Sequence, residues 1–244
     1  MSVISDSGVS STVVRLREGS NYVFDLEISA VDGSLHDFFT EEGEKTYVVV
    51  ATVFFRLRGS RLEYLGSRVK EIVSDGNGED LMRTMEYEEA NSLNGLILMD
   101  RKITMDMDLG LSIPRSVIGI VKDFDQRERN NLDIPNPPWL IISQDGPIRK
   151  GYVKLANHGW IFRVETNVDW NSEDVLSLLY AMSREPIPEA LGYNYPLFLA
   201  DKMAKFYRDR AKRTLDFLTS KELVRYRTFR SLVEGRRRSW NLNR

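Results

Sequence analysis

The sequence predicts an α+β fold in which a mixed sheet is flanked by helices. Three runs rich in β-branched and aromatic residues follow one another before the first helical pattern. A short apolar strand follows that helix, and two further helical patterns lie towards the C-terminus. A helical layer packed on a sheet that begins with three consecutive strands is typical of α+β proteins.

The three N-terminal strands have the clearest signals. Residues 21–32, "NYVFDLEISAVD", form an apolar run that leads to Asp32. Residues 45–59, "KTYVVVATVFFRLRG", have the β-branched and aromatic composition and the length of a central strand. Residues 61–73 alternate between polar and apolar side chains, as a third strand does. Residues 1–20 indicate a frayed start or a lone edge strand.

The first helix is predicted over residues 79–93, after the chain-breaking "SDGNG", with Asp80 as its cap. Met82, Met85, Glu86, Glu89 and Leu93 recur at helical spacing on one face of this segment. Two carboxylates therefore lie within a mostly apolar stripe. They are either the polar edge of an amphipathic helix or groups placed for chemistry.

The next elements complete the core. "GLILMD" is a short buried strand that stops at Asp100, and residues 116–124 form a fifth strand. Asp106 and Asp108 alternate with methionine, as solvent-facing strand residues do. Residues 125–150 hold four of the eight prolines, so we expect an insertion with little regular structure there.

A hairpin near residues 152–166 and two helices follow. Ser172 caps the first helix, which reaches Met182, and a long helix runs from about Pro196 to Thr219. Three strands, a helix and a fourth strand are the order of a ribonuclease-H-like core. We expect a single domain over residues 1–244, with its core at about 21–124 and 151–220.

Charge is unevenly distributed along the 244 residues. Residues 202–244 contain 14 basic and 4 acidic side chains, a net charge of +10, whereas the remainder contains 20 and 32, a net charge of −12. This predicts a basic C-terminal helical arm that meets a polyanion such as DNA, or else a solvated helical face. The candidate DNA-binding side chains of its first helical part are Lys202, Lys205, Arg208 and Lys212.

Several classes of function find no support in the sequence. The chain has no cysteine, which excludes disulfides, thiolate metal sites and cysteine nucleophiles. No apolar run is long enough to cross a membrane and no signal-peptide pattern begins the chain, so we expect a cytoplasmic protein. No phosphate-binding glycine loop or nucleophile elbow occurs, and His36 and His158 match no metal or triad spacing.

The strongest chemical signal is a set of carboxylates at strand ends. Asp32 and Asp100 each close an apolar strand, and Glu86 or Glu89 could reach the same place from the intervening helix. Carboxylate oxygens suit Mg²⁺ or Mn²⁺, and paired ions of this kind serve phosphodiester hydrolysis. Taken alone, however, Asp32-Gly33 is also a common turn pair.

Five segments occur in this order: "AVDGSL" at residues 30–35, "LILMD" at 96–100, "IGIVKDF" at 118–124, "WIFRVET" at 160–166 and "GYNYPLFLADKMAKFYRDRAKR" at 192–213. Together they resemble the NurA family of DNA-end-processing nucleases. The resemblance runs from about residue 28 to residue 215. It implies a ribonuclease-H-like nuclease that uses Mn²⁺ or Mg²⁺, as two ions.

The resemblance also implies roles for individual residues. Asp32 and Asp100 match the metal-binding aspartates, and Glu86 matches the helical glutamate, with Glu89 as the alternate. Tyr193 or Tyr195 matches the active-site tyrosine. The further matches are Asp201, at a position where many members have histidine, and Lys122, which could contact the scissile phosphate.

The sequence departs from the family at two places. The second aspartate is followed by Arg101-Lys102 where the family has Gly-Ser, and Asp201 is an anion where the family often has a proton donor. The resemblance implies DNA end processing or recombination, a homodimer, and a HerA-type hexameric ATPase as partner. Two alternatives stay open, a decayed nuclease that acts as a DNA-binding adaptor, and a Holliday-junction resolvase.

Overall fold

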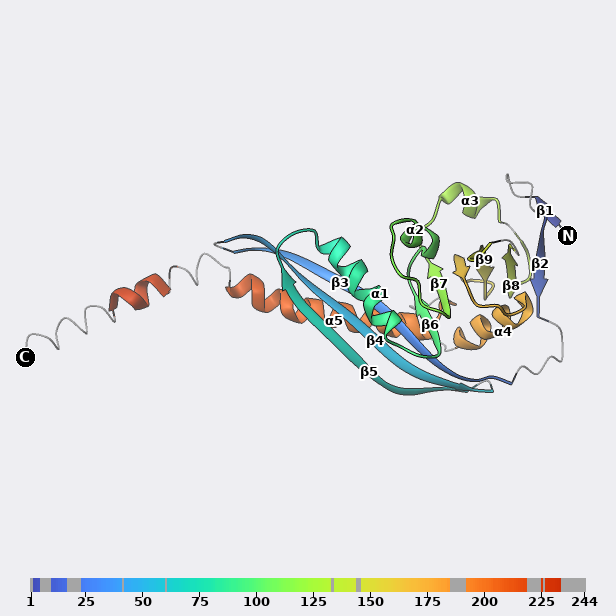
Figure 1. Cartoon of the computed structure of the whole chain (residues 1–244), viewed down its shortest axis with the longest axis horizontal. Helices are drawn as coiled ribbons and strands as arrows, with labels where there is room; N and C mark the ends of the chain where they lie inside the picture. Colours follow the sequence, from blue (N-terminus) through green and yellow to red (C-terminus); the bar gives the residue numbers. More distant parts are fainter. Residues whose placement is uncertain are drawn as a thin grey trace, which may run out of the picture.

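A computed structural model shows a ten-stranded mixed sheet with helices on both faces (Figure 1). The strand order is β1-β2-β8-β9-β10-β7-β6-β3-β4-β5. The predicted α+β class with a ribonuclease-H-like order is confirmed. The structure describes residues 2–4, 10–16, 23–40, 42–59, 61–132, 134–143, 146–184, 192–218, 225 and 227–233.

Three long antiparallel strands form one end of the sheet. They are β3 (Asp25–Thr40), β4 (Gly43–Arg58) and β5 (Arg61–Ser74). The apolar centre of β4 is buried, as predicted for a central strand. The expectation that the first strand ends at Asp32 is wrong, because β3 continues for eight residues beyond it and pairs with β4 throughout.

The middle of the sheet is parallel. β6 (Leu96–Met99) pairs with β3 on one side and with β7 (Val117–Val121) on the other, and both pairings are parallel. β6 is short and pairs with β3 only over Ile28–Val31. The edge of β3 on that side therefore has no strand partner beyond Val31 within the described residues.

The other half of the sheet is antiparallel. β10 (Ile161–Thr166) pairs with β7 and with β9 (Arg149–Lys154), which confirms the predicted late hairpin. β8 (Trp139–Ile142) and β2 (Ser10–Arg15) follow, and β1 (Ser2–Ile4) lies at the edge.

Residues 125–150 are more regular than expected. They contain α3 (Gln126–Asn130), the whole of β8 and the start of β9. All four residues of β8 are buried between neighbouring strands, because three of the four prolines fall before the strand and the fourth falls after it, which leaves "WLII" free to pair. The expectation of little regular structure is wrong here, and the proposal that this segment is an insertion stays a prediction.

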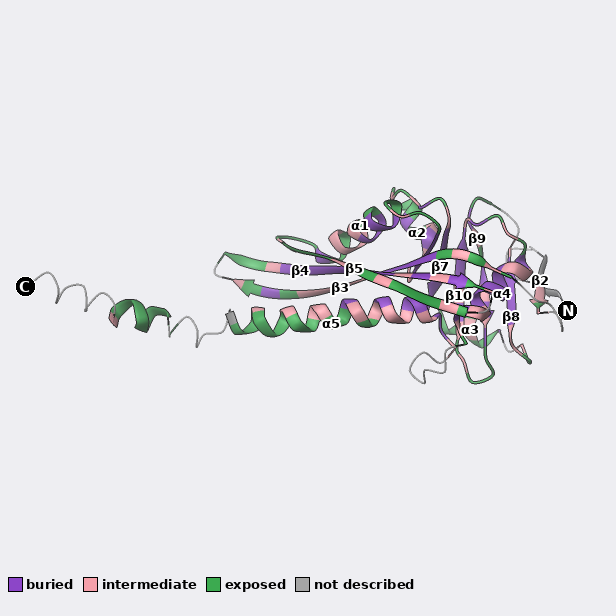
Figure 2. Ribbon diagram, turned by 90° about the horizontal axis from the view of Figure 1, so that it is seen from below, coloured by how far each residue is buried: buried purple, intermediate pink, exposed green. Residues whose placement is uncertain are grey.

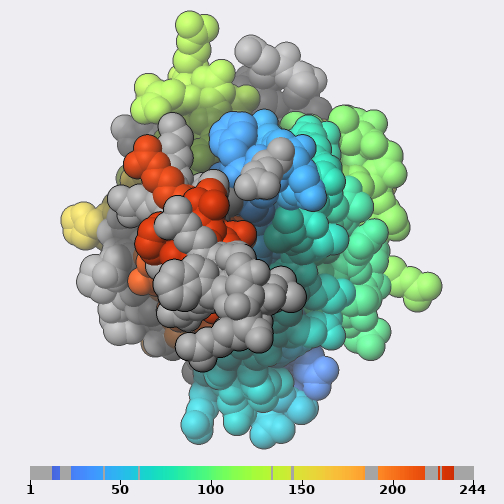
Figure 3. Space-filling view, turned by 90° about the vertical axis from the view of Figure 1, so that its left-hand side faces the viewer, coloured from blue at the N-terminus to red at the C-terminus, as the bar shows by residue number. Residues whose placement is uncertain are grey.

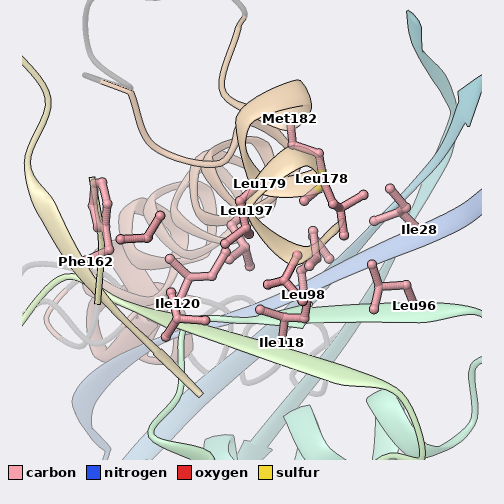
Figure 4. Close-up of a cluster of buried hydrophobic side chains, with 14 of the residues drawn as sticks. Ile28, Leu96, Leu98, Ile118, Ile120, Phe162, Leu178, Leu179, Met182 and Leu197 are labelled. Atoms are coloured by element: carbon pink, nitrogen blue, oxygen red, sulfur yellow. The ribbon is translucent and has the colours of Figure 1, made fainter. Parts of the chain in front are cut away.

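Helices cover the two faces of the sheet separately (Figure 2). α5 (Tyr195–Leu218) lies along one face of β3 and β4, and α1 (Gly78–Asn91) lies on the other. α4 (Ser172–Met182) packs on the side of α5, where its leucines meet alternate residues of the central strands (Figure 4). Successive β3 residues point to opposite faces, so Ala30 joins the α4–α5 core and Val31 joins the α1 core.

Local details differ from the sequence prediction at three helix starts. α1 begins earlier than predicted, with Asn77 as its cap, and α4 is capped by Asn171. α2 (Ile103–Asp108) occupies the "MDMD" segment, so Asp106 is a fully buried helical residue and the strand interpretation was wrong. The methionine-aspartate alternation was too short to distinguish the two periods.

The tips of the long strands β3 and β4 lie at the end of the sheet that is farthest from β8 and β9 (Figure 1). Viewed from that end, the tip of the β3–β4 hairpin lies beside β5 and α1 (Figure 3). No helix in the described part of the chain is long and apolar enough to cross a membrane. The predicted long helix is confirmed as α5, but much of the predicted basic arm, residues 219–224, 226 and 234–244, lies outside the described residues.

Candidate active site

The parallel register of the central strands brings Asp32 and Asp100 together. The last residues paired between β3 and β6 are Val31 and Met99, and the next residue on each strand is an aspartate. Residues that leave parallel strands in the same direction meet at one edge of the sheet. Asp32 is half-buried, and its Oδ1 accepts a hydrogen bond from the Gly33 N–H at 3.0 Å.

Lys122 and Tyr193 close the site around Asp100. Lys122 follows β7, and its Nζ lies 3.3 Å from Asp100 Oδ2 and 4.2 Å from the centre of the Tyr193 ring. The buried Tyr193 hydroxyl donates to Asp100 Oδ2 at 3.5 Å. Tyr195 instead packs its ring on Phe55, so the structure places Tyr193 and not Tyr195 beside the aspartates.

Asp201 lies on α5, which covers the face of the sheet opposite to α1. It lies in the second turn of α5, on the face of the sheet to which Asp32 points, and its Oδ1 is 2.7 Å from Lys205 Nζ. Its charge raises the pKa of both Asp32 and Asp100. Asp201 therefore lies near both aspartates.

The carboxylates disfavour one another's ionisation. Burial raises the pKa of Asp32 well above its usual range, and the charges of Glu86, Asp100 and Asp201 raise it further. Burial also raises the pKa of Asp100, although Lys122 offsets part of the rise. Among the described residues, no cationic side chain forms an ion pair with Asp32. A site of this kind is relieved by a bound cation.

Glu86 reaches the same edge of β3 through Gly33. Gly33 faces α1, and a Cβ atom on it would lie 2.3 Å from Glu86 Oε1. Burial raises the pKa of Glu86, and the ion pair with Arg101, 2.5 Å from Nε to Oε2, offsets part of that rise. Arg101, which replaces a glycine of the family pattern, is thus the partner of the candidate helical ligand.

Glu89 lies elsewhere. Its buried carboxylate accepts hydrogen bonds from Thr52 and Arg68 and lies 2.5 Å from Lys70 Nζ, over β4 and β5. Burial raises its pKa, but these three donors outweigh burial and leave the pKa lowered. The structure brings Glu86 and not Glu89 to the aspartates.

The remaining candidates lie on α5 or apart from the site. Lys202 lies over the ring of Phe198 at 5.3 Å, Arg208 donates to Ser34, and Lys212 is exposed. His36 is in β3, and its Nε2 is 3.1 Å from Asp216 Oδ1.

Sequence reasoning missed one buried network beside the site. Asp106 accepts a hydrogen bond from the Tyr87 hydroxyl at 2.9 Å and lies 3.4 Å from Arg83 Nε. It also lies close enough to Glu86 to raise the pKa of that carboxyl. The signal for it was the apolar "ITM" that precedes Asp106, which would have favoured a buried helical turn.

The oxygen atoms of the site are of the chemical type that binds a hard divalent cation. They are the carboxylate oxygens of Asp32, Asp100, Glu86 and Asp201, which come from β3, the end of β6, α1 and α5, with a tyrosine hydroxyl beside them. Mg²⁺ and Mn²⁺ prefer such oxygen ligands. As the side chains stand, no three His, Cys, Asp or Glu residues in the described part of the chain are grouped to hold a metal ion. Asp100, Asp201 and Glu86 each form an ion pair with a cationic side chain.

Comparison with known proteins identifies the region that carries Lys122, Tyr193 and Asp201. Residues 112–206 match the NurA domain. The resemblance to NurA is confirmed. Asp32, Glu86 and Asp100 precede the matched NurA segment, so their place in the site depends on the strand register and not on that match. No curated protein matches the chain.

Solved structures agree on the fold. Human ENDOV superposes with a TM-score of 0.51 at 11% identity, covering 82% of this chain and 93% of its own. The NurA nuclease from Sulfolobus solfataricus has a TM-score of 0.49 at 16% identity, covering 83% and 88%. A NurA crystal structure with manganese has a TM-score of 0.44 at 12% identity, covering 80% and 88%. The superposition on human ENDOV shows that this chain shares the overall fold of that protein.

Proposed function

We propose that this chain is a metal-dependent nuclease that hydrolyses DNA phosphodiesters. The observation that carries the proposal is the juxtaposition of Asp32 and Asp100 at the end of a parallel strand pair. Their mutual charge repulsion supports a cation between them, and the NurA match supports nuclease chemistry. The manganese in a solved NurA structure supports Mn²⁺ as one suitable ion.

Asp32, Asp100 and Glu86 would hold the metal, with Asp201 as a further oxygen donor. When bound, ions of this kind activate water for attack on phosphorus and stabilise the leaving oxygen. Among the described residues, Asp32 has no ion pair to break before it binds a metal. Asp100 would have to break its ion pair with Lys122, and Glu86 would have to break its ion pair with Arg101.

The chain's own cations would act on the substrate. Lys122 lies beside Asp100, so once released from that carboxylate its ammonium can bind a non-bridging oxygen of the scissile phosphate. Burial and the nearby carboxylates raise the pKa of Tyr193 well above its usual range, which keeps the hydroxyl protonated as a hydrogen-bond donor. Tyr193 therefore orients Asp100.

The substrate and partners follow from the resemblance and from charge. Lys202, Lys205 and Lys212 on α5 would attract DNA phosphates without regard to sequence, so binding should weaken with salt. By resemblance, we propose a homodimer that acts in the cytoplasm on DNA ends with a HerA-type hexameric translocase. The ion pair between Glu86 and Arg101 favours one alternative, a DNA-binding adaptor on a decayed nuclease core.

Cleavage assays separate these two functions. The purified protein is incubated with labelled linear double-stranded and single-stranded DNA in Mn²⁺, in Mg²⁺ and in EDTA. We expect cleavage that requires the metal and disappears in an Asp32→Asn/Asp100→Asn variant. Binding of DNA without cleavage in either metal would establish the adaptor, and equal cleavage by the variant would exclude these aspartates.

A further inference from the structure

Beside the carboxylates, the chain forms a hollow that no part of the proposed chemistry uses. It has a volume of about 460 Å³, within the ~300–1,000 Å³ typical of ligand pockets. Three of its eight lining residues are arginines and one is an acid, Glu79. The complete lining is Gly33, Ser34, Leu35, Glu79, Met82, Arg83, Arg101 and Arg208.

The hollow lies directly beyond the candidate metal ligands. Gly33 and Ser34 follow Asp32 in the chain, and Arg101 follows Asp100. Arg208 lies seven residues after Asp201 on α5, which is two turns along the same helix face and about 10 Å along its axis. The residues that line the hollow thus belong to, or directly follow, the same elements that supply the carboxylates.

The open edge of β3 explains why the hollow exists. β6 stops pairing at Val31, so no strand pairs with the edge of β3 at Gly33–Leu35 within the described residues. Arg208 reaches this edge from the α5 face, where its Nη1 donates to Ser34 Oγ at 3.1 Å. Arg83 and Arg101 reach it from the α1 face. A chain that passes along this edge would meet guanidinium groups from both layers.

The arginines are held in place but retain free donors. Arg101 uses Nε for Glu86, and Arg83 uses Nη1 for Asp80, at 3.2 Å. Among the described residues, neither Nη of Arg101 nor Nη2 of Arg83 has a hydrogen-bond partner. Arg208 binds Asp209, whose side chain is 55% exposed, so that pair is weak and can be exchanged.

We propose that this hollow binds a phosphate group of the DNA strand next to the scissile one. Guanidinium forks match phosphate oxygens in geometry and charge, which favours phosphate over a base or a neutral ligand. Gly33 has no side chain, and Glu86 and Met82 fill the space that a Cβ atom there would need, so the glycine lets α1 pack close to this edge of β3. The inference rests on the proposed function, since it takes DNA as the substrate. It assigns to Arg208 and Arg101 the binding of one particular phosphate, and not only a general attraction of DNA by positive charge.

Binding in EDTA tests the pocket without catalysis or metal. Fluorescence anisotropy is measured with a labelled single-stranded oligonucleotide for the parent, Arg208→Gln and Arg213→Gln. Arg213 is a matched control because it lies on α5 and loses the same charge, but it bonds only its own helix, at Asp209 O. We expect Arg208→Gln to raise Kd about tenfold, as loss of a charge-assisted hydrogen bond does. We expect Arg213→Gln to raise it about twofold.

A neutral methylphosphonate placed at each position of the oligonucleotide locates the phosphate. One position should weaken binding to the parent about tenfold and have no further effect in Arg208→Gln. Oligonucleotides with a 5′-phosphate or a 5′-hydroxyl distinguish a terminal phosphate from an internal one. Equal losses in the two arginine variants, or methylphosphonate effects that simply add to Arg208→Gln, would overturn the pocket.

Two further readouts keep the result unambiguous. Arg208→Lys retains the positive charge but not the forked guanidinium, so its Kd should lie between those of the parent and Arg208→Gln. This variant replaces Arg208→Gln in the test if the glutamine variant is too unstable to measure. If the methylphosphonate effect disappears in Arg208→Gln in EDTA but the protein cleaves no DNA, the pocket is supported and the nuclease function is rejected. If the protein cleaves DNA normally but the methylphosphonate effect is unchanged in Arg208→Gln, only the pocket is rejected.

Discussion

Asp32→Asn should abolish most DNA cleavage while making the metal-free protein more stable. Loss of a ligand that holds a catalytic metal costs several kcal/mol of transition-state stabilisation, so we expect a fall in rate of about 10²–10³-fold. The same substitution removes a buried charge that Glu86, Asp100 and Asp201 repel. Relief of such a functional strain contributes about 0.5–2 kcal/mol.

The stability gain should depend on pH in a defined direction. The pKa of Asp32 is raised in the folded state, so the folded protein holds this proton more tightly than the unfolded chain does. Protonated Asp32 therefore stabilises the parent protein at low pH, and this stabilisation is lost as pH rises from about 4 through the raised pKa. The difference in melting temperature between Asp32→Asn and the parent should therefore grow over that interval, by about 2–4 °C for each kcal/mol.

Asp25→Asn is the control for this comparison. Asp25 lies on the same strand in an exposed pair with Arg56, and that pair lowers its pKa. Its substitution should leave cleavage unchanged and stability equal or slightly reduced. If Asp32→Asn destabilises the metal-free protein at pH 8, the electrostatic description of the site is wrong.

Arg101→Ala should produce the largest loss of stability near the site. The Glu86 side chain is 3% exposed and that of Arg101 is 17% exposed, so the substitution leaves a buried carboxylate without its partner. Breaking a buried pair in this way costs about 3–5 kcal/mol. A urea titration at neutral pH measures the loss.

A second substitution identifies its cause. Glu86→Gln in the Arg101→Ala background removes the stranded charge and should recover much of the lost free energy of unfolding. Arg56→Ala, which breaks the exposed pair with Asp25, should cost at most about 1 kcal/mol. A loss in Arg101→Ala no larger than in Arg56→Ala would show that the Glu86 pair is not buried in solution.

The sequence predicted the composition of the site better than its geometry. Asp32 and Asp100 were found because each follows an apolar run, and the register that pairs Val31 with Met99 does bring them together. The same pattern misplaced the end of β3. The segment "LHDFF" keeps aliphatic and aromatic side chains, and it pairs with β4, so the strand continues. Gly33 therefore serves close approach by Glu86 instead of a turn.

Contacts between distant residues could not be predicted. Arg101 was noted only as a departure from a family pattern, and nothing local indicates that it would meet Glu86, fifteen residues earlier. The hollow lies where β6 ends before β3 does and where Arg208 of α5 reaches Ser34, and a hydrophobic period encodes neither feature.

Binding of Mn²⁺ to the isolated protein tests the central claim most directly. Isothermal titration calorimetry at pH 8, without DNA, is performed on the parent and on the Asp32→Asn/Asp100→Asn variant, with Asp25→Asn as the control. The account predicts saturable Mn²⁺ binding by the parent and the control, and its loss in the double variant. Absence of binding by the parent, or equal binding by the double variant, would contradict a metal site at Asp32 and Asp100.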